Sequence, residues 1–240
     1  MSFFWFVRHA LAAQFSRLPP ADQFARHAVE SGVGSLGLLT LLIVFAGMSL
    51  SIQGYGAFSR FGGQSFLGLF CGIGGIRELY PVMAAIVCGA RIGANLAASL
   101  ANMQISEQVE ALEVMAIDPL RYLVAPRLWA VTLAMPLLCA YADVVGLAAS
   151  YFAAVEQMGV DGGIFMAQLR QIVGWQDLAA GVFKGVLFGW LVAIVACYHG
   201  YRAAKREGAE GVGVATNRAI VHSAVLCIVL NMILSAILYA

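Results

Sequence analysis

Four apolar stretches, each long enough to cross a lipid bilayer, limit this chain to a small set of folds. A membrane-spanning helix needs about 20 mostly apolar residues, because the hydrocarbon core is about 30 Å thick. The stretches that meet this length are Val33–Gln53, Leu128–Val155, Leu178–Tyr198 and Thr216–Tyr239. Only 11% of the 240 residues are charged, whereas about 25% are charged in a soluble domain. The chain is therefore predicted to be an all-α integral membrane protein.

A further apolar region, Phe66–Met103, is too long for one simple span and contains Arg77, Glu78, Pro81 and Arg91. We interpret it as one tilted or kinked helix that follows a membrane-level approach segment at Leu67–Ile76, which gives five transmembrane helices. The alternative is two short segments joined by a re-entrant turn within residues 66–91. That alternative gives six membrane segments, and both remain open at this point.

The N-terminal segment Phe3–Leu18 is rich in aromatic residues and ends at Pro19-Pro20. It is short for a span, and no basic residue precedes its apolar part, as one would in a signal peptide. Aromatic residues suit the headgroup boundary, so an amphipathic helix lying at the membrane interface is predicted. We therefore divide the chain into an interfacial helix and linker at 1–30 and one membrane domain at 31–240.

Lysine and arginine residues are distributed unequally between the two sides of the predicted bundle. The loops at Gly54–Ser65 and Glu156–Gln176 hold only Arg60 and Arg170. The other side holds Arg8, Arg17, Arg26, Arg121, Arg127, Arg202, Lys205, Arg206 and Arg218. Cytoplasmic loops carry the excess of basic residues, which predicts a cytoplasmic N-terminus and a C-terminus on the far side.

One cytoplasmic loop, Met103–Ile117, is predicted to form a short amphipathic helix. Ser106 is expected to cap its N-terminus, and Asp118-Pro119 to end it. At 100° per residue the glutamates Glu107, Glu110 and Glu113 share one side, and the opposite side carries Val109, Leu112, Met115 and Ala116. Three glutamates are repelled by an anionic inner leaflet, so a protein partner is favoured over the membrane surface.

Charged residues at membrane depth are costly and usually face a bundle interior or a cavity. Arg77 and Glu78 are adjacent, so they point about 100° apart and are not expected to pair with each other. They either lie near a lipid headgroup or form ion pairs with other helices. Arg91 is expected to pair with Asp143 or to extend toward the cytoplasmic surface. The apolar and aromatic residues near the end of the first span are Ile52, Tyr55, Phe58 and Phe61, which by themselves indicate an interfacial belt.

Several functional classes are disfavoured. The net charge of +1 offers no basic stripe for nucleic acid. The five cysteines and four histidines are scattered, so they predict neither a metal site nor a redox pair. The P-loop pattern and a nucleophile–base pair are absent from the sequence. Nothing in the sequence therefore resembles an ATP site, so any energy that the protein uses would come from another subunit or from an ion gradient.

Several short blocks of residues lie in order along most of the chain. They are Arg77-Glu78-Leu79 with Pro81, Gly89–Ala94, Glu107-Gln108, Ala111-Leu112, Met115, Asp118-Pro119, Tyr122, Pro126-Arg127 and Gly208–Gly213 with Ala215-Thr216. Together these blocks resemble the MlaE (YrbE) family of ABC-transporter permeases. Two positions depart from the family's usual pattern. Ser99 stands where a glutamate is common, and Asn231 stands where an acidic residue is common.

The resemblance implies a homodimeric permease of the bacterial inner membrane, with a cytoplasmic ABC ATPase that binds ATP and Mg²⁺, a periplasmic MCE-domain protein and a STAS-domain protein as partners. The cargo would be phospholipid, the role outer-membrane lipid asymmetry, and no cofactor is expected in this chain. The implied lipid-binding residues are Arg77, Glu78, Ile52, Tyr55, Phe58 and Phe61. The implied ATPase-coupling residues, on a helix near 104–117, are Glu107, Glu110, Ala111, Leu112, Met115 and Asp118.

A competing hypothesis is an ion-coupled secondary transporter that uses Arg77, Glu78 and Asp143 as a relay. Such transporters often contain inverted repeats, and the odd span count without a visible repeat argues against it. A membrane-embedded enzyme is a third hypothesis, for which no catalytic set is recognisable.

Overall fold

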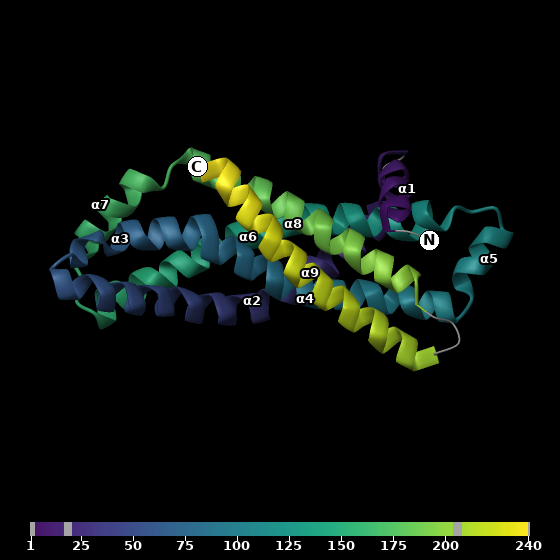
Figure 1. The fold of residues 1–240 in the computed structure, drawn as a ribbon, viewed down its shortest axis with the longest axis horizontal. Helices are drawn as coiled ribbons and strands as arrows, with labels where there is room; N and C mark the ends of the chain where they lie inside the picture. The colour runs from purple at the N-terminus through teal and green to yellow at the C-terminus, as the bar shows by residue number, and fades with distance from the viewer. Residues whose placement is uncertain (1–2, 17–20, 204–207, 240) are drawn as a thin grey trace. The chain divides into compact units, whose positions relative to one another are not determined.

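The computed structural model describes residues 3–16, 21–203 and 208–239, and these residues form helices and short connections without any β-strand (Figure 1). The helices are α1 (Phe3–Ser16), α2 (Ala21–Phe58), α3 (Leu67–Phe70), α4 (Tyr80–Ile105), α5 (Gln108–Val114), α6 (Ala125–Phe152), α7 (Gly162–Ile172), α8 (Trp175–Tyr201) and α9 (Gly208–Tyr239). Two 3₁₀ turns, Ser59–Phe61 and Gln64–Phe66, follow α2. Three π-helical segments are present at Cys71–Leu79, Leu120–Val124 and Ala153–Gln157.

Five helical stretches of the described chain are long and apolar enough to cross a membrane. They are Phe24–Phe61, Gln64–Ile105, Leu120–Gln157, Trp175–Tyr201 and Gly208–Tyr239. The prediction of five spans is confirmed, and the chain is a multi-pass α-helical membrane protein. The region 64–105 is one continuous helix that passes through the π-helical segment Cys71–Leu79, so the re-entrant pair is not formed. The spanning helices extend beyond the predicted apolar stretches because helical hydrogen bonding continues through their polar flanks.

The chain divides into two compact units, and α2, α4, α6, α8 and α9 each contribute to both. The first unit contains Met1–Ser35, Ile86–Met135 and Val186–Val229. The second unit contains Leu36–Ala85, Pro136–Gly185 and Leu230–Ala240.

The second unit is held together by close helix contacts at small residues. A Cβ atom on Gly47 of α2 would lie 2.3 Å from the carbonyl oxygen of Gly146 on α6, so only glycine permits this approach. Ser150 Oγ donates to the Gly47 carbonyl at 2.8 Å, and Tyr80 Oη lies 2.6 Å from Ser150 Oγ. Tyr80 is fully buried. Its hydroxyl therefore has a partner, as a buried polar group requires.

In the second unit α7 packs against α3, which it meets at the left of Figure 1. A Cβ atom on Gly68 would lie 2.2 Å from the carbonyl oxygen of Phe165. Asp161 caps α7, because its side chain accepts a hydrogen bond from Ile164 N at 2.9 Å. The cap and the close contact fix α7 beside the start of the second spanning helix.

In the first unit, one face of α1 packs against α6 and α8. Phe6 and Ala10 are fully buried, Phe6 contacts Tyr198 of α8, and Trp129 Nε1 of α6 donates to the Gln14 carbonyl at 3.0 Å. Phe4 and Phe15 are exposed. The structure thus forms the predicted N-terminal helix, and its position at a membrane interface stays a prediction. Of the predicted interfacial helix and linker at 1–30, residues 1–2 and 17–20 lie outside the described residues, and residues 21–30 belong to α2.

Candidate functional site

A group of interacting charged and polar side chains lies inside the second unit, among helices that are otherwise apolar. We call it the polar cluster, and its members are Arg77, Glu78, Asp177, Lys184, Asn231 and Ser235. They come from the π-helical segment before α4, from α8 and from α9. Ionisable side chains in a membrane-spanning bundle usually mark a functional site, so the cluster is the leading candidate.

The local sequence explains why the backbone is open to a side chain here. Proline has no N–H, so Pro81 cannot donate the helical hydrogen bond to the carbonyl of Arg77, four residues earlier. Lys184 Nζ donates to that carbonyl at 2.6 Å. A buried carbonyl without a donor is costly in a membrane, and the lysine of α8 removes that cost.

Lys184 is the centre of the cluster. Its side chain is fully buried, and Nζ also donates to Ser235 Oγ at 2.7 Å and lies 3.7 Å from Glu78 Oε1. The ammonium group lies 5.0 Å from the centre of the Tyr239 ring. An ammonium has three donors. The carbonyl and the hydroxyl accept from two of them, and the nearby carboxylate balances the charge.

Arg77 and Glu78 have separate partners, as their adjacent positions on a helix predict. Arg77 Nε lies 2.7 Å from Asp177 Oδ1, and its guanidinium carbon lies 4.9 Å from the Tyr239 ring centre. Glu78 Oε2 accepts a hydrogen bond from Asn231 Nδ2 at 2.8 Å. Each charge is thus paired with a group from another helix of the same unit.

Asp177 also fixes the start of α8, since its Oδ2 accepts a hydrogen bond from Gly174 N at 3.0 Å. A pocket of roughly 630 Å³ lies beside this ion pair and is lined by Arg77, Trp175, Gln176, Asp177, Ala179, Ala180, Phe183, Leu238 and Tyr239. This lining combines charged side chains with apolar and aromatic ones, which suits a ligand that has both a charged and an apolar part.

The four other predicted lipid-binding residues do not line this pocket. Tyr55 and Phe58 pack against the buried group formed by Leu67, Cys71, Ala154 and Phe165. Ile52 and Phe61 are exposed, Phe61 by 88%. The structure therefore brings Arg77 and Glu78 together in the polar cluster and places the apolar residues elsewhere in the second unit.

Sequence reasoning missed Lys184 and Asp177 and treated Asn231 only as a departure from a family pattern. The available signal was a single lysine within the apolar stretch Leu178–Tyr198, because an unpaired lysine there would be costly. Asp143, another predicted membrane charge, is buried in the same unit, and its Oδ1 has no hydrogen-bond partner.

Arg91 belongs to the first unit, whereas Asp143 belongs to the second. The Arg91 guanidinium nitrogen Nη2 lies 3.2 Å from where a Cβ atom on Gly34 would be. Arg91 also lines a smaller pocket of roughly 140 Å³, together with His27, Glu30, Ser31, Ser35, Ile92, Asn95 and Leu96. The residues around Arg91 in this pocket therefore come from α2 and α4.

The predicted amphipathic helix forms as α5, but its ends differ from the prediction. Ser106 does not cap it. Ser106 Oγ donates backward to the Asn102 carbonyl at 2.8 Å, and Glu107, with a φ of 61°, is the residue that precedes α5. Ser106 belongs instead to the end of α4, because a serine hydroxyl can donate a hydrogen bond to the carbonyl four residues earlier in a helix.

The end of α5 also differs. Ala116 has a φ of 58°, and Ile117 N donates to the Leu112 carbonyl at 2.9 Å, which is the Schellman pattern. Asp118 does not stop α5. Its Oδ1 accepts a hydrogen bond at 3.0 Å from the N–H of Leu120, the first residue of the following segment Leu120–Val124.

The exposed surface of α5 combines acidic and apolar side chains. Val109 is buried, Leu112 is half-buried, and the exposed residues include Glu107, Glu110, Ala111, Glu113, Val114, Met115 and Asp118. Met115 is 59% exposed and Val114 is 88% exposed. Met115 and Ala116 belong to the apolar side predicted for Val109 and Leu112, but both are exposed, because the packed part of this side ends at Leu112.

Five helices long enough to span a membrane, three of which carry a charged cluster beside a pocket, define a polytopic helical membrane protein with a polar site of the kind that permeases contain. Comparison with known proteins agrees with this class. The chain belongs to the MlaE permease family, because the family described as Permease MlaE matches residues 24–237.

Relatives of known name share about a third of their residues with this chain. A probable ABC transporter permease protein of Rickettsia typhi is 34% identical over 214 residues, which cover 89% of this chain and 82% of the relative. The intermembrane phospholipid transport system permease protein MlaE of Haemophilus influenzae is 35% identical over 209 residues, with coverages of 87% and 79%. The chloroplastic protein TRIGALACTOSYLDIACYLGLYCEROL 1 of Arabidopsis thaliana is 33% identical over 210 residues, with coverages of 88% and 59%.

Proposed function

We propose that this chain is the membrane-spanning permease subunit of an ABC-type phospholipid transporter. Two copies would form the permease and move phospholipid between the bacterial inner membrane and a periplasmic MCE-domain protein, in support of outer-membrane lipid asymmetry. The names of the Rickettsia and Haemophilus relatives, an ABC transporter permease and a phospholipid transport permease, support this proposal.

The observation that carries the proposal is the polar cluster with its pocket. Arg77 remains 27% exposed and Glu78 remains 43% exposed although both are paired. A zwitterionic or anionic headgroup can therefore compete for these partners, with its phosphate at the guanidinium of Arg77. The exposed side chains of Ile52 and Phe61 would contact acyl chains, with Tyr55 and Phe58 behind them.

The surface of α5 is the proposed contact for the cytoplasmic ATPase. Exposed apolar side chains surrounded by acidic ones are typical of a protein interface rather than of a free surface. In this proposal Glu107, Glu110, Ala111, Leu112, Met115 and Asp118 face the ATPase. ATP and Mg²⁺ would be bound by that subunit, with no cofactor in this chain, and a STAS-domain protein would complete the cytoplasmic assembly.

Reconstitution of the chain with its ATPase and MCE partners in liposomes tests this function. We expect ATP-dependent transfer of a fluorescent phospholipid to or from the MCE protein. The double variant Glu107→Ala/Glu110→Ala should co-purify with less ATPase and should lose most of this transfer, because it removes two of the exposed acidic groups of α5.

Glu156→Ala is the matched control, since Glu156 is an exposed glutamate outside α5, and it should behave as the wild type. Lipid transfer that is driven by an ion gradient and unaffected by ATP would instead support the secondary-transporter hypothesis. Full ATPase co-purification with the double variant would remove α5 from the proposal.

A further inference from the structure

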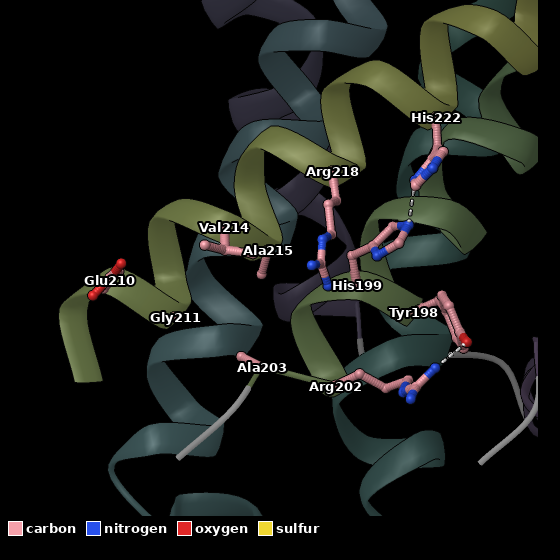
Figure 2. Close-up of a pocket in the computed structure, with 10 residues that line it drawn as sticks. All are labelled: Tyr198, His199, Arg202, Ala203, Glu210, Gly211, Val214, Ala215, Arg218 and His222. Carbon is pink, nitrogen blue, oxygen red and sulfur yellow. Dashed lines mark hydrogen bonds between the residues drawn. The ribbon is translucent and has the colours of Figure 1, made fainter. Parts of the chain in front are cut away.

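A second polar pocket, of about 700 Å³, lies in the first unit where α8 ends and α9 begins (Figure 2). It is lined by Tyr198, His199, Arg202, Ala203, Glu210, Gly211, Val214, Ala215, Arg218 and His222. The polar cluster belongs to the other unit, and the proposed transport function gives this pocket no role.

Three nitrogen-containing side chains converge at one end of the pocket. Arg218 and His222 lie four residues apart on α9, so they share a face of that helix, and both point toward His199 of α8 (Figure 2). His222 Nδ1 lies 2.9 Å from His199 Nε2, and the two rings are stacked with centroids 4.8 Å apart. One ring donates to the other, so the accepting ring keeps its own N–H for a ligand, whereas the second nitrogen of the donating ring is an acceptor.

Arg218 lacks a carboxylate partner among the described residues. Arg202, the other arginine of the pocket, is already engaged, because it donates to the Tyr198 hydroxyl and lies 5.4 Å from the centre of that ring. A guanidinium carries five donors in a planar fork and binds anions in two-point contacts. The free donors of Arg218 therefore favour an anion at this end of the pocket.

The single acidic side chain of the pocket does not oppose this arrangement. Glu210 lies in the first turn of α9, where a carboxylate is stabilised by the positive end of the helix. Figure 2 shows Glu210 at the far end of the pocket from the histidine pair. On the α9 side the buried small residues Gly211 and Ala215 leave the space open between the two ends.

The position of Arg218 along α9 indicates which anion is available. The apolar run that follows it, Ala219–Leu238, has about the 20 residues that a hydrocarbon core requires. Arg218 therefore lies at the edge of the apolar layer, at the level of the headgroups. Basic pockets between helices at this level bind phosphate-bearing headgroups.

We propose that Arg218, with His199 and His222, binds a phosphate group, and that the phosphate belongs to a membrane phospholipid held at the edge of the bilayer. Free inorganic phosphate has the same chemistry and is the second source to be tested. The inference does not depend on lipid transport, because the site can be measured on this chain alone.

Thermal unfolding of the purified full chain in a neutral detergent tests the site. The probes are dioleoylphosphatidylglycerol, dioleoylglycerol with the same acyl chains but no phosphate, and inorganic phosphate. The variants are Arg218→Gln and His222→Gln, with Arg170→Gln as the control because Arg170 is an exposed arginine of α7, outside the pocket. A ligand that binds only the folded chain raises the melting temperature.

We expect the phospholipid, and not dioleoylglycerol, to raise the melting temperature of the wild type and of Arg170→Gln. The lipid concentration that gives half of the rise should increase about tenfold in Arg218→Gln, since a charge-assisted contact is lost. An equal, Arg218-dependent rise with inorganic phosphate would support the phosphate site and assign it to the free anion. His222→Gln, which keeps the arginine, serves the same comparison if Arg218→Gln does not fold.

Two results would overturn the proposal. One is a melting temperature of the wild type that no phosphate-bearing probe changes. The other is a lipid concentration dependence that is the same in Arg218→Gln, His222→Gln and Arg170→Gln.

Discussion

At the scale of single residues, the polar cluster depends on one lysine and one proline that lie far apart in the sequence. Pro81 leaves the Arg77 carbonyl without its helical donor, and Lys184 supplies a donor from another helix. The same ammonium group lies beside Glu78. Lys184 therefore has two roles at once: it donates to the free Arg77 carbonyl in the second spanning helix, and it offsets the negative charge of Glu78.

This coupling predicts that substitutions at Glu78 and Lys184 are not additive. Lys184→Met should lower the free energy of unfolding by about 2 kcal/mol or more, because it leaves the Arg77 carbonyl and the Glu78 carboxylate without the ammonium group. Glu78→Gln should cost less, since the amide oxygen still accepts from Asn231. Denaturant unfolding in detergent should show the double variant to be about 0.5–3 kcal/mol less destabilised than the sum of the single variants.

Glu156→Gln is the control for this cycle, because it makes the same chemical change at an exposed glutamate outside the cluster. It should not change the unfolding free energy of either the wild type or Lys184→Met. If the destabilisations by Glu78→Gln and Lys184→Met simply add, the 3.7 Å contact between the two side chains contributes no interaction energy to stability.

At the scale of elements, the second unit depends on helices that approach one another at glycine. The backbone of α2 meets that of α6 at Gly47 and Gly146, and Tyr80 of α4 packs on the same glycine of α6, with ring atoms 2.7 Å from where its Cβ atom would be. Ser150 then joins α2 to α6 by a hydrogen bond. Close backbone contact is the usual basis of helix packing in lipid, where burial of apolar surface gives little advantage.

A pair of glycine substitutions on α2 tests this packing. Gly47→Ala should destabilise the chain by about 1–3 kcal/mol, because its Cβ atom would overlap the Gly146 carbonyl oxygen and the backbones would have to separate. Gly37→Ala, on the same helix with no atom within 4 Å of the added carbon, should be neutral or stabilise by up to about 1 kcal/mol. The test compares the melting temperatures of Gly47→Ala and Gly37→Ala in the same detergent. Equal melting temperatures would contradict the close contact between Gly47 and Gly146.

At the scale of the whole molecule, the five candidate spanning helices and the unequal distribution of basic residues predict a direction of insertion. With an odd number of spans, we expect the two termini on opposite sides of the membrane. The loop that contains α5 is expected on the side of the N-terminus, and the connection after α2 on the other side. The positive-inside rule predicts that the first of these sides is cytoplasmic.

Cysteine labelling in intact cells tests this orientation. The five native cysteines are buried, so an impermeant maleimide should give little background. Ala111→Cys on α5 should react only after the inner membrane is permeabilised, whereas Ser65→Cys should react once the periplasm is accessible; both positions are exposed. The reverse pattern would place α5 in the periplasm and exclude a contact with an ATPase.

The sequence alone was sufficient for the all-α membrane fold and the membership of the permease family. It favoured five spans over six membrane segments, and the continuous helix at 64–105 decided between them. These properties follow from length, hydropathy and short motifs, each of which is local along the chain. Arg77 and Glu78 could be selected for the same reason, since a charge in an apolar stretch is visible without a structure. The exposed residues of α5 were also largely predictable from helical periodicity.

Only the tertiary structure identified which groups neutralise those charges. The partners of Arg77 and Glu78 lie at positions 177, 184 and 231, and no periodicity connects residues so far apart. The same holds for the pairing of His199 with His222 across α8 and α9. Helix contacts depend on how surfaces fit in three dimensions, so the location of the charges is encoded locally, whereas their partners are decided by the packing of the helices.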